Sequence, residues 1–200
     1  MRHHAKLSLL VAGLSVVLSA CNGSTPCAQP PPGGSAPELY FGSGFLPDDP
    51  ESIARKTGFV RFLQAMAEPS LSRGSRGASY RLLMWRSTRP LYGLTVVRVE
   101  LVNGVVMSRL ARRGEDSVSS CAAHEISLDE WREIDDCFNR SGYWMATSRV
   151  QQGVIMDGSG WVLEAARPGQ YHAVIADPET DIDPAVRRCG LLLERHARDL

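Results

Sequence analysis

Residues 94–113, LTVVRVELVNGVVMSRLARR, decide the fold of this chain. Before the dipeptide Asn103-Gly104, apolar side chains recur at alternate positions, which is the period of a β-strand. Asn-Gly favours a type I′ turn, because both of its positions require a positive φ. The stretch therefore predicts a β-hairpin with strands at about 94–102 and 105–112.

The two faces of the first predicted strand differ in polarity. Val97 and Val99 lie on one face, whereas Arg98 and Glu100 point to the other. This alternation is typical of an antiparallel sheet with one face on the core and one face in water. We therefore expect helices to cover only the apolar face.

Other segments carry comparable strand and helix patterns. Further strands are expected at about 80–88, 120–126, 161–167 and 170–176. Helices are expected at about 50–67, 128–141 and 184–198, each behind a capping Asp or Ser. The links between neighbouring strands look like short hairpins. The predicted fold class is α+β, a mostly antiparallel sheet of hairpin-linked strands with two or three helices packed on one face.

The first residues of the chain have the layout of a secretory signal peptide. Arg2 and Lys6 precede an uncharged run over residues 7–20, which is rich in Leu, Val, Ala and Ser. A bilayer-spanning helix needs about 18–20 apolar residues, so this run is short for a transmembrane anchor. We interpret residues 1–20 as a cleaved leader.

The end of this leader, Leu18-Ser19-Ala20-Cys21, resembles the lipobox of bacterial lipoproteins. The resemblance implies that the chain is cleaved after Ala20 and that Cys21 carries a diacylglyceryl group and an acylated amine. Asn22 follows Cys21, and in that family the absence of Asp at this position favours the outer membrane. The alternative is an ordinary signal peptide cut near Ala20, which would leave Cys21 as a plain thiol.

Behind the leader, residues 21–37 read as a tether and residues 38–200 as a single globular domain. The tether is rich in Pro, Gly and Ser and has no periodic apolar pattern. Fully extended, it could hold the domain up to roughly 50 Å from a membrane. A disulfide bond at Cys27 would shorten this reach.

Charge and composition exclude a nucleic-acid surface of the usual kind. The whole chain has 22 basic and 22 acidic residues, and removal of residues 1–20 takes away Arg2 and Lys6. A strong basic excess is the mark of nucleic-acid binding, and it is missing here. The expected partners are instead the membrane, through the acylated Cys21, and an envelope protein or glycan.

Four further cysteines accompany Cys21, namely Cys27, Cys121, Cys137 and Cys189. An even number in an exported protein suggests disulfide bonds, and four cysteines allow three pairings. We predict a bond between Cys137 and Cys189, because both lie in helices that should pack side by side on the sheet.

One group of residues could act in catalysis or bind a metal ion. Cys121 and His124 could be half of a thiol or zinc site, with His172 as a distant partner, although no second close ligand pair appears. The structural alternatives are a bridged Cys121 and a hydrogen-bonded core His172. No P-loop, GxSxG, GxGxxG or HExxH motif is present, so the sequence assigns no catalytic residue, metal or cofactor.

An acidic segment near the end of the chain suggests Ca²⁺ but lacks the features of an EF-hand. Asp177, Glu179, Asp181 and Asp183 occupy alternate positions. The glycine and the terminal bidentate glutamate of such a loop are missing, and Asp183 already caps a helix. We interpret the segment as a solvated turn.

The aromatic residues fit a core better than a surface. Each tryptophan lies where an amphipathic element needs an apolar side chain: Trp85, Trp131, Trp144 and Trp161. The alternative is a partner surface of Trp85, Tyr92 and Tyr143. The spacing Trp161-x-Leu163-Glu164 with Gly169-x-Tyr171-His172 resembles bacterial proteins of no assigned function, which implies a shared fold at most.

The sequence as a whole predicts a lipid-anchored protein of the bacterial envelope, facing the periplasm, with a non-catalytic binding or interaction domain. The alternative from another class is an envelope hydrolase or thiol enzyme that uses Cys121, His124 or His172. A purely structural spacer is a third interpretation.

Overall fold

The structure is a computed structural model. It describes residues 25–26, 40–73, 77–86, 93–113, 119–148, 159–179 and 182–198. The expected leader, Cys21, Cys27, Tyr92 and Asp181 lie outside these residues.

Each predicted strand and helix is present. In chain order the elements are β1 (Thr25–Pro26), α2 (Pro50–Ala65), β2 (Ser79–Arg86), β3 (Gly93–Val102), β4 (Val105–Arg113), β5 (Ser119–Glu125), α3 (Leu128–Arg140), the short 3₁₀ helix η1 (Tyr143–Met145), β6 (Ser159–Arg167), β7 (Gln170–Ala176) and α4 (Pro184–Arg198). The helix α3 begins at the capping box that the sequence indicates, with Ser127 and Glu130 each bonded to the other's backbone N–H.

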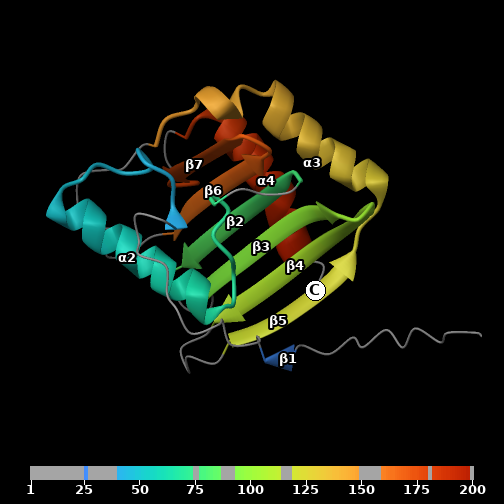
Figure 1. Ribbon diagram of the computed structural model, residues 1–200, viewed down its shortest axis with the longest axis horizontal. Helices are drawn as coiled ribbons and strands as arrows, with labels where there is room; N and C mark the ends of the chain where they lie inside the picture. Colours follow the sequence, from blue (N-terminus) through green and yellow to red (C-terminus); the bar gives the residue numbers. More distant parts are fainter. Residues whose placement is uncertain are drawn as a thin grey trace, which may run out of the picture.

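The strands form one sheet in the order β1-β5-β4-β3-β2-β6-β7, and every neighbouring pair is antiparallel. β1 and β7 therefore lie at opposite edges (Figure 1). The α+β prediction with a mostly antiparallel sheet is confirmed. One strand was not predicted: β1 lies inside the segment 21–37 expected as a tether.

The hairpin turn between β3 and β4 has the backbone conformation that its sequence predicts. Asn103 has a φ of 52° and Gly104 a φ of 83°. Both values lie in the left-handed region, which a type I′ turn requires. The turn fixes the register of β3 and β4, with Val102 opposite Val105.

One face of the sheet packs against α3 and α4. Val97 and Val99 of β3 are fully buried there, together with Phe138 of α3 and Leu193 of α4. Cys137 of α3 and Cys189 of α4 form a disulfide with a Cα–Cα distance of 5.7 Å. This is the predicted pair, and it joins the two helices side by side on the face where two were expected.

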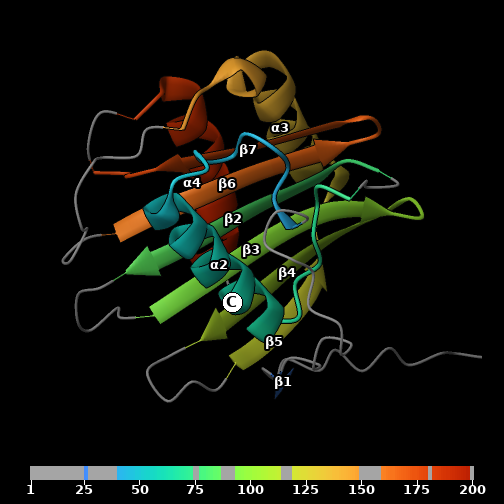
Figure 2. The same ribbon diagram turned by 60° about the vertical axis from the view of Figure 1, so that its left-hand side comes forward.

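The opposite face is also covered, which corrects the expectation of one face in water. The third helix, α2, lies across this face, as Figure 2 shows with α4 behind the sheet. Phe59 and Leu63 of α2 pack there with Leu83, Val96 and Val162 of the strands. Residues 40–46 complete the cover with Tyr40, Phe41, Phe45 and Leu46.

The charged residues that suggested a face in water form ion pairs, with Arg98 buried and Glu100 partly exposed. Arg98 is 8% exposed, and its Nε lies 2.8 Å from a carboxylate oxygen of the fully buried Glu68. Alternation of charge along β3 thus reflects a buried ionic layer under α2. Sequence periodicity reports which side chains share a face, but it does not report whether a charged side chain finds a partner there.

Of the three residues of the alternative aromatic surface, the two that the structure describes, Trp85 and Tyr143, lie on opposite faces of the sheet. Trp131 and Trp161 are buried in the core, as expected. Tyr143 is also fully buried, on the face covered by α3 and α4, whereas Trp85 packs against Phe59 under α2. In the part of the chain that the structure describes, no helix has the length and apolar character needed to cross a bilayer.

Candidate binding cleft

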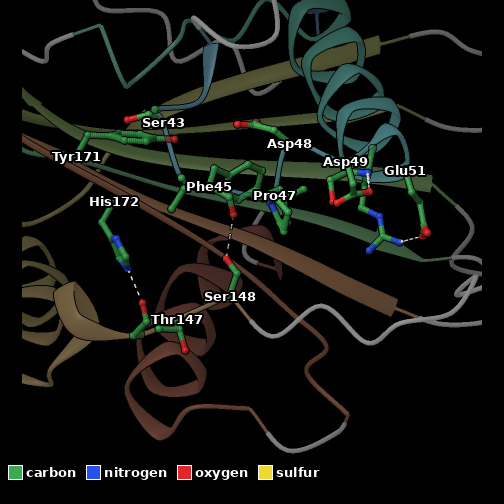
Figure 3. A pocket seen from close by; sticks show the side chains of 17 residues that line it. Ser43, Phe45, Pro47, Asp48, Asp49, Glu51, Thr147, Ser148, Tyr171 and His172 are labelled. Atoms are coloured by element: carbon green, nitrogen blue, oxygen red, sulfur yellow. Dashed lines mark hydrogen bonds and ion pairs between the residues drawn. The ribbon is translucent and has the colours of Figure 1, made fainter.

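A cleft of about 1040 Å³ lies beside the edge strand β7 (Figure 3). Three segments form it: residues 42–55 at the start of α2, residues 146–148 after η1, and residues 171–173 of β7. The three come from distant parts of the sequence. The sheet topology brings them together, because β7 is the last strand and its outer side faces these loops.

The floor of the cleft is apolar and rigidly packed. Phe45, Leu46 and Ala173 line it and are almost completely buried. Phe45 stacks on Phe41 with a ring-centroid distance of 4.5 Å, and Phe41 contacts Phe59 of α2. Through these aromatic contacts the floor of the cleft is continuous with the hydrophobic core under α2.

Hydrogen bonds fix the walls of the cleft to each other. The hydroxyl of Ser148 donates to the carbonyl of Phe45 at 3.4 Å and accepts from the backbone N–H of Ile175 at 3.2 Å. Nε2 of His172 lies 2.8 Å from the carbonyl of Ala146. The segment 146–148 is thereby bonded to both other walls, as the dashed lines in Figure 3 show for Ser148 and His172.

Tyr171 connects the cleft to the buried ionic layer. Its hydroxyl donates a hydrogen bond to Glu164 at 2.8 Å. Burial and the neighbouring Glu164 carboxylate raise the pKa of Tyr171 well above its ordinary value. The hydroxyl is therefore neutral at physiological pH and acts as a fixed donor.

The ionic layer itself is balanced in charge. Glu164 pairs with Arg81, and Glu68 is surrounded by three guanidinium groups, those of Arg81, Arg98 and Arg109. Arg98 also pairs with Glu100. The layer therefore contains three guanidinium groups and three carboxylates, and each forms at least one ion pair. We interpret this layer as structural, since its charges are satisfied within the protein.

The outer rim of the cleft is acidic. Asp48, Asp49 and Glu51 lie on it, with Arg55 as the basic residue among the lining residues. Asp49 is the N-cap of α2, and the hydrogen bond from the Ser52 N–H lowers the pKa of its carboxyl. Glu51 pairs with Arg55 at 2.9 Å.

The residues proposed for a thiol enzyme do not come together. Cys121 and His124 are three positions apart on β5, so their side chains point to opposite faces of the sheet. His172 is on β7, five strands away from β5, which is about 24 Å at about 4.8 Å a strand. Cys121 is, moreover, disulfide-bonded.

Two carboxylates of the acidic segment, those of Asp177 and Asp183, accept hydrogen bonds from nearby backbone N–H groups. Asp177 accepts from the N–H of Glu179 at 2.9 Å, and Asp183 accepts from the N–H of Ala185 at 2.8 Å. Among the residues that the structure describes, no group of three or more His, Cys, Asp or Glu side chains is arranged for a metal ion.

The cleft was not among the sequence predictions, apart from His172. Its lining includes the loop Gly42-Ser43-Gly44, whose composition marks a turn but not a site. Only contact between segments 42–55, 146–148 and 171–173 creates the cleft, and a single sequence does not report such contacts. No protein-family model matches the chain, and no curated protein is similar to it.

Proposed function

We propose that the chain is a lipid-anchored protein of the bacterial envelope whose domain binds a ligand in the cleft beside β7 without catalysing a reaction. The observation that carries the binding role is the cleft of about 1040 Å³ with an apolar floor and hydrogen-bonded walls. Ligand sites are typically concave, mostly apolar and already formed before binding. The anchor rests on the lipobox Leu18-Ser19-Ala20-Cys21.

The polar groups of the cleft favour ligand binding over catalysis. One ring nitrogen of His172 is engaged with the Ala146 carbonyl, and the Ser148 hydroxyl is engaged on both sides. A nucleophile needs a base within hydrogen-bond reach, and these two groups hold the walls instead. A thiol enzyme built on Cys121, His124 and His172 has no support in the distances between them.

The size of the cleft favours a segment of a polymer, either a peptide or a glycan of the envelope. Drug-sized pockets have volumes of about 300–1000 Å³, and this cleft of about 1040 Å³ lies just above that range and opens along the side of a strand. Asp48 is paired with Lys56 and Glu51 with Arg55, and Asp49 adds a third carboxylate, so the rim is weakly acidic and disfavours anionic ligands. A cationic peptide would be attracted by these carboxylates, and a neutral glycan would not be repelled.

The binding role is tested by blocking the cleft with one side chain. Thr147 lines the cleft and is exposed, so Thr147→Trp should fill the space beside segment 42–55. Met145 is 85% exposed and is not a lining residue, so Met145→Trp is a matched control two positions away. Native mass spectrometry of protein extracted gently from its own membrane should show a bound mass that Thr147→Trp loses and Met145→Trp keeps.

Two results would contradict the binding role. One is a bare monomer that also shows no chemical-shift changes in its cleft residues when titrated with cationic peptides or neutral glycan fragments. The other is equal binding by both tryptophan variants. The anchor is tested separately, because the denatured mass of the extracted protein should equal residues 21–200 plus acyl groups. An unmodified Cys21 would reject the anchor and leave the cleft proposal intact.

A further inference from the structure

The start of the domain is attached to the edge of the sheet that lies farthest from the cleft. Thr25 and Pro26 form β1 and pair with Cys121 and Ser120 of β5. Figure 1 shows β1 beside β5, at the edge opposite β7. The chain therefore reaches the domain at β5, twelve residues before the expected tether ends at residue 37.

Covalent geometry then limits how far Cys21 can be from this edge. Thr25 is four positions after Cys21, and an extended chain spans at most about 3.3–3.6 Å a residue. Whatever conformation residues 21–24 adopt, Cys21 lies within about 14 Å of Thr25, and therefore within about 20 Å of Cys121, the β5 residue opposite Thr25. A tether free over its whole length would have allowed roughly 50 Å.

A covalent bond supports the same attachment. Cys121 is disulfide-bonded, and Cys137 and Cys189 are bonded to each other. Because Cys137 and Cys189 are bonded to each other, we expect Cys121 to be bonded to Cys27 if Cys21 carries lipid through its sulfur. Such a bond would join β5 to the chain six residues after the anchor.

We propose that the β5 edge of the sheet lies against the lipid surface that holds the acyl groups of Cys21, and that the cleft faces away from it. This inference rests on the proposed lipid anchor. β7 is five strand spacings from β5, about 24 Å, so the cleft would be held clear of the headgroups. The ligand would then be a component of the periplasm and not of the bilayer on which the protein sits.

The orientation is measurable by energy transfer to the membrane. The full lipidated chain is reconstituted in phosphatidylcholine–phosphatidylglycerol vesicles that contain an acceptor dye on a headgroup. A fluorescent amino acid replaces Ala123, which is exposed on β5, or Ser43, which is exposed beside the cleft. Transfer should be several-fold stronger from position 123 than from position 43, and equal transfer would overturn the proposal.

A pair of insertions separates a short anchor from other causes of orientation. About 16 Gly/Ser residues inserted between Asn22 and Gly23 lengthen the chain before β1 and should remove most of the difference between the two positions. The same insertion between Pro32 and Gly33 lies after β1 and should leave the difference unchanged. Equal effects of both insertions would reject a role of β1 as the attachment point.

Peptide mapping without reduction distinguishes failure of this inference from failure of the proposed function. A Cys27–Cys121 peptide together with an acylated Cys21 supports both. A Cys21–Cys121 peptide would exclude thioether lipidation of Cys21 and overturn the anchor itself. An acylated Cys21 with equal energy transfer from positions 123 and 43 would keep the anchor and reject the orientation.

Discussion

Arg81 of β2 and Glu164 of β6 are directly opposed in neighbouring strands, and both side chains are completely buried. Nη2 of Arg81 lies 2.6 Å from a carboxylate oxygen of Glu164. The pair lies between β2 and β6, beneath Tyr40 and the loop after α2, where the Arg81 guanidinium also donates to the Pro69 carbonyl. An ion pair without water contact is sensitive to loss of one partner, because the remaining charge stays buried.

We expect Glu164→Leu to lower the free energy of unfolding by about 3–5 kcal/mol, since it leaves the Arg81 charge without its closest partner. The double variant Arg81→Met with Glu164→Leu should recover a large part of this loss. Urea unfolding of the parent, the single variants Arg81→Met and Glu164→Leu, and the double variant gives the coupling energy. As a control, Arg132→Met removes an exposed pair with Asp129 and should change stability by less than about 1 kcal/mol. Strict additivity of the two core substitutions would contradict a coupled pair.

Two helical glycines should respond in opposite directions to the same substitution. Gly58 of α2 has open space around a new Cβ, so Gly58→Ala should stabilise the protein by up to about 1 kcal/mol through helix propensity. At Gly190 of α4 a Cβ would lie 2.3 Å from the ring of Trp161. Gly190→Ala should therefore destabilise by about 1–3 kcal/mol through overpacking. Urea unfolding measures both, and a stabilised Gly190→Ala protein would show that α4 can move away from β6.

The fold could be predicted from sequence because its signals are local. The Asn103-Gly104 turn, the capping box at Ser127 and the strand periods each depend on residues close in the chain. The cover on the second face could not be predicted in this way. Arg98 and Glu100 look like solvent-facing residues until Glu68, 30 positions before Arg98, is placed beside them.

The same reason explains why the site was missed. His172 was noted as a single histidine, and its neighbours in the cleft come from residues 42–55 and 146–148. Cys121 and His124 looked adjacent in sequence, but the pleat of β5 separates their side chains. Proximity along a strand is thus a poor guide to a shared site when the separation is an odd number.

The disulfide between α3 and α4 should contribute strongly to stability. Cys137 and Cys189 are 52 positions apart, and closing a loop of that length removes about 4 kcal/mol of chain entropy from the unfolded state at 25 °C. We expect the double variant Cys137→Ala with Cys189→Ala to lose about 2–5 kcal/mol in urea unfolding. Ser141→Ala is a control for local packing, because its hydroxyl contacts the Cys189 sulfur. A double variant as stable as the parent would show that unfolded-state constraint contributes little here.

The buried tyrosines should make the free energy of unfolding decrease at alkaline pH. Burial raises the pKa above the ordinary value of 10 for Tyr40, Tyr80, Tyr143 and Tyr171. Below pH 10 these hydroxyls are protonated in both folded and unfolded chains, so their contribution to stability is fully present. Above pH 10 the unfolded chain loses these protons and the folded chain keeps them, so the contribution decreases as the pH rises through the folded pKa values.

Absorbance at 295 nm measures tyrosinate directly. In a Tyr92→Phe variant, which removes the tyrosine outside the described residues, we expect little tyrosinate in the folded protein as the pH passes 10. The signal should then rise cooperatively with loss of secondary structure, since unfolding exposes all four hydroxyls to water. Guanidinium-unfolded protein is the control and should titrate smoothly near pH 10. A smooth titration near pH 10 with the far-ultraviolet circular dichroism unchanged would show that the tyrosines are accessible, and would remove the link between Tyr171 and the rigidity of the cleft.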